Sequence, residues 1–168
     1  MATNKEEKFT FASVPASLSE MKALPEYALD TPFKTAALTM IVLMNYGSNT
    51  DAMYEMLDDL KGPESVSNYD KQFIKDRLEG KEYKIASYFD GATVENSYTP
   101  DKPYTISIFE NPYSYPDENW ATMFVKSSGA DSPRQLKFRR KPSTGQWFLN
   151  DIQCLSDIRT PAAADPWA

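Results

Sequence analysis

Residues 33–46 read FKTAALTMIVLMNY, and this stretch decides the fold. Its side chains leave almost no polar face, so a helix formed here must be covered by neighbours on most sides. Pro32 suits the first position of such a helix, and Gly47 suits the left-handed residue just beyond its end. The apolar run is far shorter than the roughly 20 residues that a membrane-spanning helix needs. We therefore expect a buried helix at the centre of the fold, and no membrane partner.

Further helices are expected on both sides of this segment. Ser17 and Glu20 match a capping box at the start of a short helix. An amphipathic pattern over residues 51–60 stops at a Gly-Pro pair, and Ser67 can cap a fourth helix. The apolar stripe of that fourth helix consists of Tyr69, Phe73, Ile74 and Leu78. The helical part of the chain thus covers about residues 17–80.

After the helical part, the apolar residues no longer follow a helical spacing. Short segments rich in aromatic and β-branched side chains alternate with clusters of Gly, Pro, Asn and Asp, which is typical of strands joined by turns. The expected strands are residues 83–89, 104–110, 120–126, 135–141 and 146–152. Helices followed by strands indicate an α+β domain, in which N-terminal helices pack on a C-terminal antiparallel sheet of about five strands. We expect a single domain over residues 1–168, with its sheet part at about 83–158 and a Pro-rich tail at 160–168.

Composition restricts the chemistry that this chain can perform. It has no histidine and one cysteine, Cys154. Histidine is the commonest general base and transition-metal ligand, and a lone cysteine cannot build a zinc site of the usual Cys and His composition. We therefore expect no metal and no cofactor, and a buried, unreactive Cys154. Catalysis by Asp, Glu, Lys, Tyr or Ser remains open, although the absence of a nucleophile or phosphate-binding motif favours a protein that is not an enzyme.

Charge and cysteine content bear on partners and compartment. The net charge of −6 argues against binding to nucleic acid or to anionic membranes, because both attract basic surfaces. One cysteine cannot form an intrachain disulfide, so stability does not depend on an oxidising compartment. The polar N-terminus is not followed by the apolar stretch of a signal peptide. The simplest interpretation is a cytoplasmic protein.

A loop between two expected strands is a candidate binding site. Residues 127–134 read SSGADSPR, and small hydroxyl groups, a glycine and free backbone N–H groups suit the capture of a small anion. Arg134 could add a bidentate contact to a carboxylate or phosphate. The candidate residues are Ser127, Ser128, Asp131, Ser132 and Arg134. The alternative is an ordinary hairpin loop, because turns require the same residue types.

Basic residues continue into the strand that follows this loop. Along a strand Lys137, Arg139 and Lys141 would share one face, while Leu136 and Phe138 point to the other. This pattern predicts a docking stripe for an acidic partner or for a ligand that carries phosphate. The alternative is an exposed sheet face, or an edge strand whose charges discourage pairing with other chains.

Aromatic and acidic residues supply the remaining candidates. Trp147 belongs to a group of aromatic residues that could line a pocket inside a curved sheet, or simply pack in the core. Trp167 could anchor the tail on a neighbouring protein, because tryptophan is enriched at interface hot spots. Four carboxylates on the third helix could bind a cation or act as acid and base, but they also fit its solvated face. These carboxylates belong to Asp51, Glu55, Asp58 and Asp59.

Several stretches resemble a known family when they are taken together. They are SYFDGA at residues 87–92 with Asn96, Tyr98, Thr99 and Pro100; residues 126–134; and GQWFL at 145–149, which runs to Ile158, Arg159 and the terminal DPWA. This set resembles a family of uncharacterised bacterial proteins, a domain of unknown function found in anaerobic Gram-positive bacteria. The resemblance covers roughly the C-terminal half. It implies a bacterial cytosolic origin, and no activity, cofactor or catalytic residue.

These observations lead to three hypotheses about function. The first is a non-enzymatic protein-interaction or adaptor module of a bacterial cytosolic system, which docks another protein or a second copy on its sheet and on residues 127–134. The second is a small-molecule pocket between helices and a curved sheet, as in cone-like α+β folds, which could catalyse through an Asp and a Tyr. The third is a structural subunit of a larger bacterial assembly, anchored by Trp167. A closed apolar cavity would favour the second hypothesis and a filled core the first.

Overall fold

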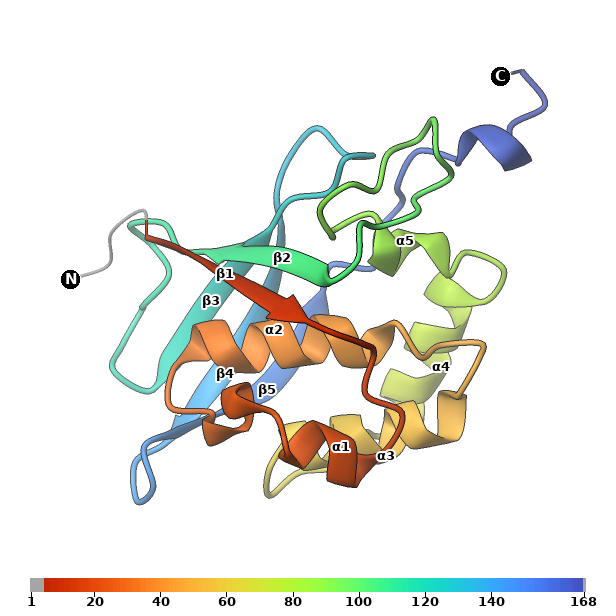
Figure 1. The fold of residues 1–168 in the computed structure, drawn as a ribbon. Coiled ribbons are helices and arrows are strands. Elements are labelled where there is room, and N and C mark those ends of the chain that lie inside the picture. The colour runs from red at the N-terminus through yellow and green to blue at the C-terminus, as the bar shows by residue number, and fades with distance from the viewer. Residues whose placement is uncertain (1–4, 168) are drawn as a thin grey trace.

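A computed structural model describes residues 5–167 of the chain (Figure 1). The elements in chain order are β1 (Glu6–Phe11), α1 (Leu18–Lys22), the 3-10 turn η1 (Pro25–Ala28), α2 (Pro32–Leu43), α3 (Thr50–Leu60), α4 (Asn68–Leu78), α5 (Tyr83–Ala86), β2 (Tyr104–Phe109), β3 (Trp120–Val125), β4 (Arg134–Lys141), β5 (Gln146–Gln153) and the 3-10 turn η2 (Ala162–Ala164). Across residues 5–167 no helix has the length and the apolar character that crossing a bilayer requires.

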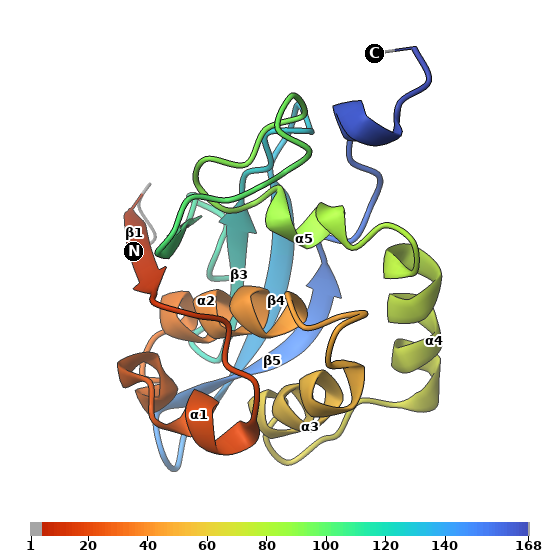
Figure 2. The same cartoon turned by 45° about the vertical axis from the view of Figure 1, so that its right-hand side comes forward.

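The strands form one five-stranded sheet in the order β1-β2-β3-β4-β5, and every neighbouring pair is antiparallel. Figures 1 and 2 show α2 lying across one face of this sheet, with α1, α3 and α4 on the same side. The α+β fold with helices packed on an antiparallel sheet is therefore confirmed. The helices occupy one face, so the opposite face of the sheet is left for solvent or for a partner.

The central helix is buried as its sequence predicts. In α2 every side chain except that of Lys34 is buried, and the helix begins where Thr31 accepts a hydrogen bond from the N–H of Lys34 at 3.2 Å. The hydroxyl of Thr35 donates to the carbonyl of Trp147 in β5 at 2.7 Å, which ties the helix to the last strand. Side chains of α2 and of the sheet fill the space between these two layers and form one continuous core.

The prediction of one strand is wrong. Residues 83–89 contain the short helix α5, and the fifth strand of the sheet is instead β1, which pairs with β2 from Glu6 opposite Phe109 to Phe11 opposite Tyr104. Burial explains both outcomes. In the first segment Ile85, Tyr88 and Phe89 are buried at helical spacing, whereas in β1 the buried Phe9 and Phe11 alternate with exposed residues as a strand requires.

The flanking helices follow their capping signals, with one misplaced side chain. Ser17 accepts from the N–H of Glu20 at 3.2 Å, and Ser67 caps α4 by accepting from the N–H of Asp70 at 3.0 Å. Tyr69, expected in the apolar stripe of α4, is instead 79% exposed. At about 100° per residue it lies roughly 140° around the helix from the buried Ile74, outside the narrow contact stripe.

Candidate functional site

The face of the sheet opposite α2 carries the basic stripe that the sequence predicts. Strand register places side chains from β2 to β5 on this outer face, and all of them are half-buried or exposed. The outer face includes Phe109, Trp120, Thr122, Phe124, Gln135, Lys137, Arg139, Lys141, Phe148, Asp151 and Gln153, with Lys126 just after β3 and Glu6, Lys8 and Thr10 on β1. Leu136 and Phe138 point to the other side and are fully buried in the core. Lys137 and Arg139 therefore share one face of β4, as the alternating pattern requires.

Aromatic rings and cations are interleaved on the outer face. The rings of Phe109 and Phe124 stack at 6.0 Å between centroids, across the junction of β2 and β3. The Lys126 ammonium lies 4.8 Å from the centroid of the Phe109 ring, and the Arg139 guanidinium lies 5.3 Å from the Trp120 ring. Cation–π contacts at such partly exposed positions contribute about 0.5–1 kcal/mol each and hold the long cationic side chains against the sheet.

The outer face is basic, although the chain as a whole is acidic. It holds Lys126, Lys137, Arg139 and Lys141 against two carboxylates, Asp151 and, opposite Phe109 on β1, Glu6, in a protein of net charge −6. At the margin of the sheet, Lys8 of β1 is paired with Asp90 at 3.4 Å. The local excess of positive charge attracts acidic groups, and the remaining surface of the protein repels them.

Residues 127–134 are packed tightly against two other segments of the chain. The hydroxyls of Ser127 and Ser87 lie 2.7 Å apart, and Ser127 also accepts from the N–H of Gly129 at 3.0 Å. The N–H of Ser128 donates to the carbonyl of Ser87, and the N–H of Ala130 donates to that of Ser127. These backbone donors are already used within the protein, so the loop does not present them to an anion.

Gly129 sits where this loop meets the C-terminal segment. A Cβ at this position would overlap the hydroxyl of Tyr98 and lie 2.5 Å from Cγ2 of Ile158. Tyr98 is buried and donates to the carbonyl of Arg159 at 2.6 Å, and the N–H of Arg159 donates to the carbonyl of Gly129 at 3.0 Å. Two stretches of the predicted family signature, near residues 87–100 and 126–134, are thus joined to the segment that contains Ile158.

The charged residues of the loop line an open depression of about 520 Å³ at this end of the molecule. Arg134 donates through Nη1 to Ser132 at 3.3 Å and through Nη2 to the carbonyl of Asp157 at 3.1 Å. Its Nε is buried and has no hydrogen-bond partner among the described residues. Asp131 is paired with Arg159. The guanidinium of Arg134 is therefore directed toward the C-terminal segment, and both acidic and basic side chains line the depression.

Lys84 of α5 is only 1% exposed and contacts Asp157, which lines this depression. Its ammonium donates to the carbonyl of Leu155 at 3.1 Å and lies 3.5 Å from Oδ1 of Asp157. Burial lowers the pKa of Lys84, and the charge of Asp157 opposes that shift. Sequence patterns did not single out this residue, because it falls in a segment expected to be a strand and a lysine side chain is normally solvated.

The two tryptophans proposed as binding residues lie in opposite environments. Trp147 is buried, with its ring edge-on to Tyr115 at 6.4 Å between centroids, whereas Trp167 is 92% exposed. The structure therefore places the predicted site residues in four separate regions of the protein. The loop residues lie at one end, Lys137 and Arg139 on the outer face, Trp147 beside the core, and Trp167 on the tail.

The arrangement of possible metal ligands and the environment of the Cys154 thiol bear on the chemistry of the protein. Within residues 5–167 no group of three or more His, Cys, Asp or Glu side chains is arranged to hold a metal ion. Cys154 is buried, and burial raises the pKa of its thiol to about 12. The thiol therefore stays protonated at neutral pH and is a weak nucleophile.

Comparison with known proteins gives one match. A family described as "Domain of unknown function (DUF6935)" matches residues 13–162, which include the helices as well as the sheet. Comparisons with curated proteins and with solved structures each give no match. The match confirms the expected family of unknown function and assigns no role to any residue.

Proposed function

This chain belongs to the Domain of unknown function (DUF6935) family, and we propose that it is a non-enzymatic interaction module that docks an acidic segment of another protein on its outer face. One observation carries the proposal. A sheet face without helices presents stacked aromatic rings interleaved with cations, on a chain whose overall charge is negative.

The residue types on this face suit protein recognition. Tryptophan and arginine are enriched among the residues that contribute most to binding energy, and Trp120 and Arg139 are already in contact. A cation held against a ring loses less conformational freedom on binding than a free side chain does. The outer face is therefore partly pre-organised for a partner.

Charge favours an acidic partner over a basic one. Lys126, Lys137 and Arg139 would pair with carboxylates of the partner, while the negative surface elsewhere would keep an acidic segment on this face. The filled core between α2 and the sheet supports this hypothesis over a small-molecule cavity enclosed at the same place. As part of the proposal we place the module in the bacterial cytosol, where a chain with one buried thiol and no disulfide is stable.

The test is a charge reversal with a matched control. The variant Lys137→Glu/Arg139→Glu changes the outer face, and Lys22→Glu/Lys75→Glu makes the same change in net charge at exposed positions of α1 and α4. Each tagged protein is isolated gently from its own host, and retained proteins are identified by native mass spectrometry. We expect the wild type and the control to retain an acidic protein that the outer-face variant loses.

The proposal fails if no protein is retained, if the retained protein is basic, or if retention is the same for both double variants. Circular dichroism of each variant checks folding first. All four substituted side chains are exposed or half-buried, so we expect both variants to fold, with the outer-face variant less stable by about 0.5–1 kcal/mol because the contact of Arg139 with Trp120 is lost.

A role as a subunit of a larger assembly is the second candidate. It is favoured by Trp167, a large aromatic side chain that is 92% exposed. Pro161 is buried and the N–H of Ala162 donates to the carbonyl of Val94 at 2.9 Å, so removing the whole tail would also remove contacts within the domain. A single substitution at Trp167 is therefore the sharper test.

A further inference from the structure

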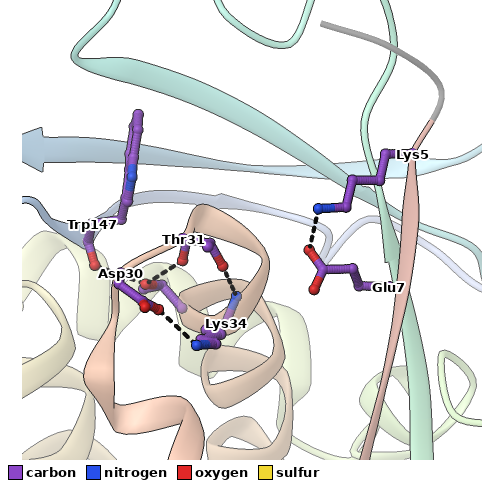
Figure 3. Close-up of polar contacts among 7 residues, drawn as sticks. Lys5, Glu7, Asp30, Thr31, Lys34 and Trp147 are labelled. Atoms are coloured by element: carbon purple, nitrogen blue, oxygen red, sulfur yellow. Dashed lines mark hydrogen bonds and ion pairs between the residues drawn. The ribbon is translucent and has the colours of Figure 1, made fainter.

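Two ion pairs lie near the start of α2. Figure 3 shows them, with Asp30 bound to Lys34 and with Lys5 facing Glu7. Charge is not balanced in this way in the open depression that is lined by Arg134 at the end of the molecule. We call this site the Arg134 depression.

The Arg134 depression has a volume of about 520 Å³ and is formed by three segments of the chain. Lys81 and Tyr83 lie at the start of α5, and Arg134 begins β4 after the loop that contributes Gly129. Arg159 comes from the C-terminal segment. A ligand in this depression would therefore contact parts of the domain that lie far apart in the sequence.

Both carboxylates that line the depression are already paired with a cation. Asp131 is paired with Arg159, and Oδ1 of Asp157 lies 3.5 Å from the ammonium of Lys84. Lys84 is buried, so its charge stays close to Asp157. These two pairs cancel the negative charge of the lining residues.

Lys81 and Arg134 supply the positive charge that is left over. Neither side chain makes an ion pair with a carboxylate of residues 5–167. Arg134 donates to neutral oxygens, the hydroxyl of Ser132 and the carbonyl of Asp157, which orient its guanidinium without cancelling its charge. Lys81 is exposed, and the neighbouring Glu82 does not line the depression. Two cations therefore face the same opening without a carboxylate partner.

Lys84 shows that positive charge is concentrated here. Burial lowers its pKa, Asp157 opposes that shift, and the charges of Lys81 and Arg77 add to it. Cations that lie close enough to disfavour one another's charge create a local positive potential. An anion placed among them would relieve this repulsion.

Tyr83 gives the depression an aromatic wall. Its ring stacks on that of Tyr98, with 5.6 Å between centroids and 10° between the ring planes. Tyr98 is fixed in turn, because its hydroxyl donates to the carbonyl of Arg159 at 2.6 Å. A ring that is held in this way offers an apolar surface to the carbon part of a ligand.

We propose that the Arg134 depression binds a small phosphate monoester, with its phosphate group held by Lys81 and Arg134 and its carbon part against Tyr83. A phosphate dianion would balance the two cations, and an arginine can contact two phosphate oxygens at once. Side chains carry this site, because the backbone donors of Ser128 and Gly129 are used within the protein. None of the lining residues belongs to the outer face, so the proposal does not depend on the docking function.

The experiment is a titration of the ¹⁵N-labelled protein with phenyl phosphate, followed by NMR. It is carried out at about pH 7.5, where a phosphate monoester with a second pKa of about 6 is a dianion. The backbone N–H signal of Gly129 reports on the depression, and the indole N–H signal of Trp120 reports on the outer face. Benzoate carries a single negative charge on the same ring, and phenol carries none.

Two variants each remove one of the cations, and a third is their control. They are Lys81→Met, Arg134→Gln and, for the loss of one exposed charge on α1, Lys22→Met. Arg134→Gln also loses the bond to the Asp157 carbonyl, which holds the C-terminal segment. Lys81→Met changes an exposed side chain and therefore tests the proposal even if Arg134→Gln does not fold.

We expect phenyl phosphate to shift the Gly129 signal and phenol to leave it in place. Binding should be about tenfold weaker for benzoate, and about tenfold weaker for phenyl phosphate in Lys81→Met and in Arg134→Gln, the factor that one charge-assisted hydrogen bond contributes. Lys22→Met should match the wild type.

The proposal is overturned if phenyl phosphate does not move the Gly129 signal, if benzoate or phenol binds as tightly as phenyl phosphate, or if Lys81→Met binds like the wild type. A shift of the Trp120 signal without one of Gly129 would place the anion on the outer face and would also overturn it. The outer-face variant Lys137→Glu/Arg139→Glu should bind phenyl phosphate normally, which separates the two proposals.

Discussion

Replacing Gly129 by alanine should destabilise the domain strongly, although the change adds only one methyl group. The new Cβ would overlap the Tyr98 hydroxyl and press on Ile158 at 2.5 Å, and both side chains are buried. Overpacking of this kind costs about 1–3 kcal/mol. If Tyr98 moves, its hydrogen bond to the carbonyl of Arg159 is also lost, which costs about 1 kcal/mol more. The expected total is about 3 kcal/mol.

The loss can be measured by urea unfolding followed by circular dichroism. For a domain of this size, about 3 kcal/mol corresponds to a fall in Tm of about 6–12 °C. Ser128→Ala is the control, because Ser128 is exposed and its backbone contact remains. It should change stability by less than about 0.5 kcal/mol. In a Tyr98→Phe background the alanine should cost about 1 kcal/mol less, because the overlapping oxygen is gone. Equal costs in both backgrounds, or a stable Gly129→Ala protein, would refute the reasoning.

Three further predictions concern ionisation and the tail. Tyr27 donates to Asp59 at 2.7 Å, and burial, this bond and the Asp59 charge raise its pKa from 10.0 to about 12. The contribution of the neutral Tyr27 phenol to stability is present below pH 10 and is lost as pH rises from 10 to 12. In urea titrations at pH 9 and pH 11, Tyr27→Phe should therefore lose less unfolding free energy between the two pH values than the wild type does. Equal losses would contradict this prediction. The lowered pKa of Lys84 means that the unfolded chain binds the Lys84 proton more tightly than the folded protein does. The unfolding free energy of the wild type should therefore rise relative to that of Lys84→Met as pH increases toward 10.5. A constant difference between the two proteins would show that the shift is absent. Trp167→Ala should leave the unfolding free energy within about 0.5 kcal/mol and, if the tail anchors an assembly, should shift the native protein to a smaller species in size-exclusion chromatography. An unchanged elution volume would remove that candidate.

The success of the sequence-based predictions depended on whether a feature was local. The caps at Ser17 and Ser67 form between residues three apart, and α2 could be placed because nearly all its side chains are apolar. The strands β3, β4 and β5 follow from short alternating patterns between turns. The segment at 83–89 was misassigned because aromatic content suits strands and buried helices alike, and only the spacing of its buried residues separates the two.

In the candidate sites, too, local features could be predicted and long-range contacts could not. That Lys137 and Arg139 share a face follows from the period of a strand, and the structure confirms it. That the partner rings are Trp120 and Phe109 could not be predicted, because they come from other strands whose register is set by long-range pairing. The burial of Lys84 was missed entirely, since it depends on contacts with Leu155 and Asp157, which lie 71 and 73 positions further along the chain.

Local patterns in the sequence are enough to predict the class of fold, the central helix and the alternation of charge along β4, and the composition shows that the chain has no histidine. Each of these patterns depends on residues close together in the chain, where helix and strand geometry leave few choices. Which face stays uncovered, how Gly129 meets Tyr98 and how Lys84 comes to lie beside Asp157 depend instead on long-range packing. These contacts form when the layers pack and the strands choose their neighbours, and no local pattern encodes that choice.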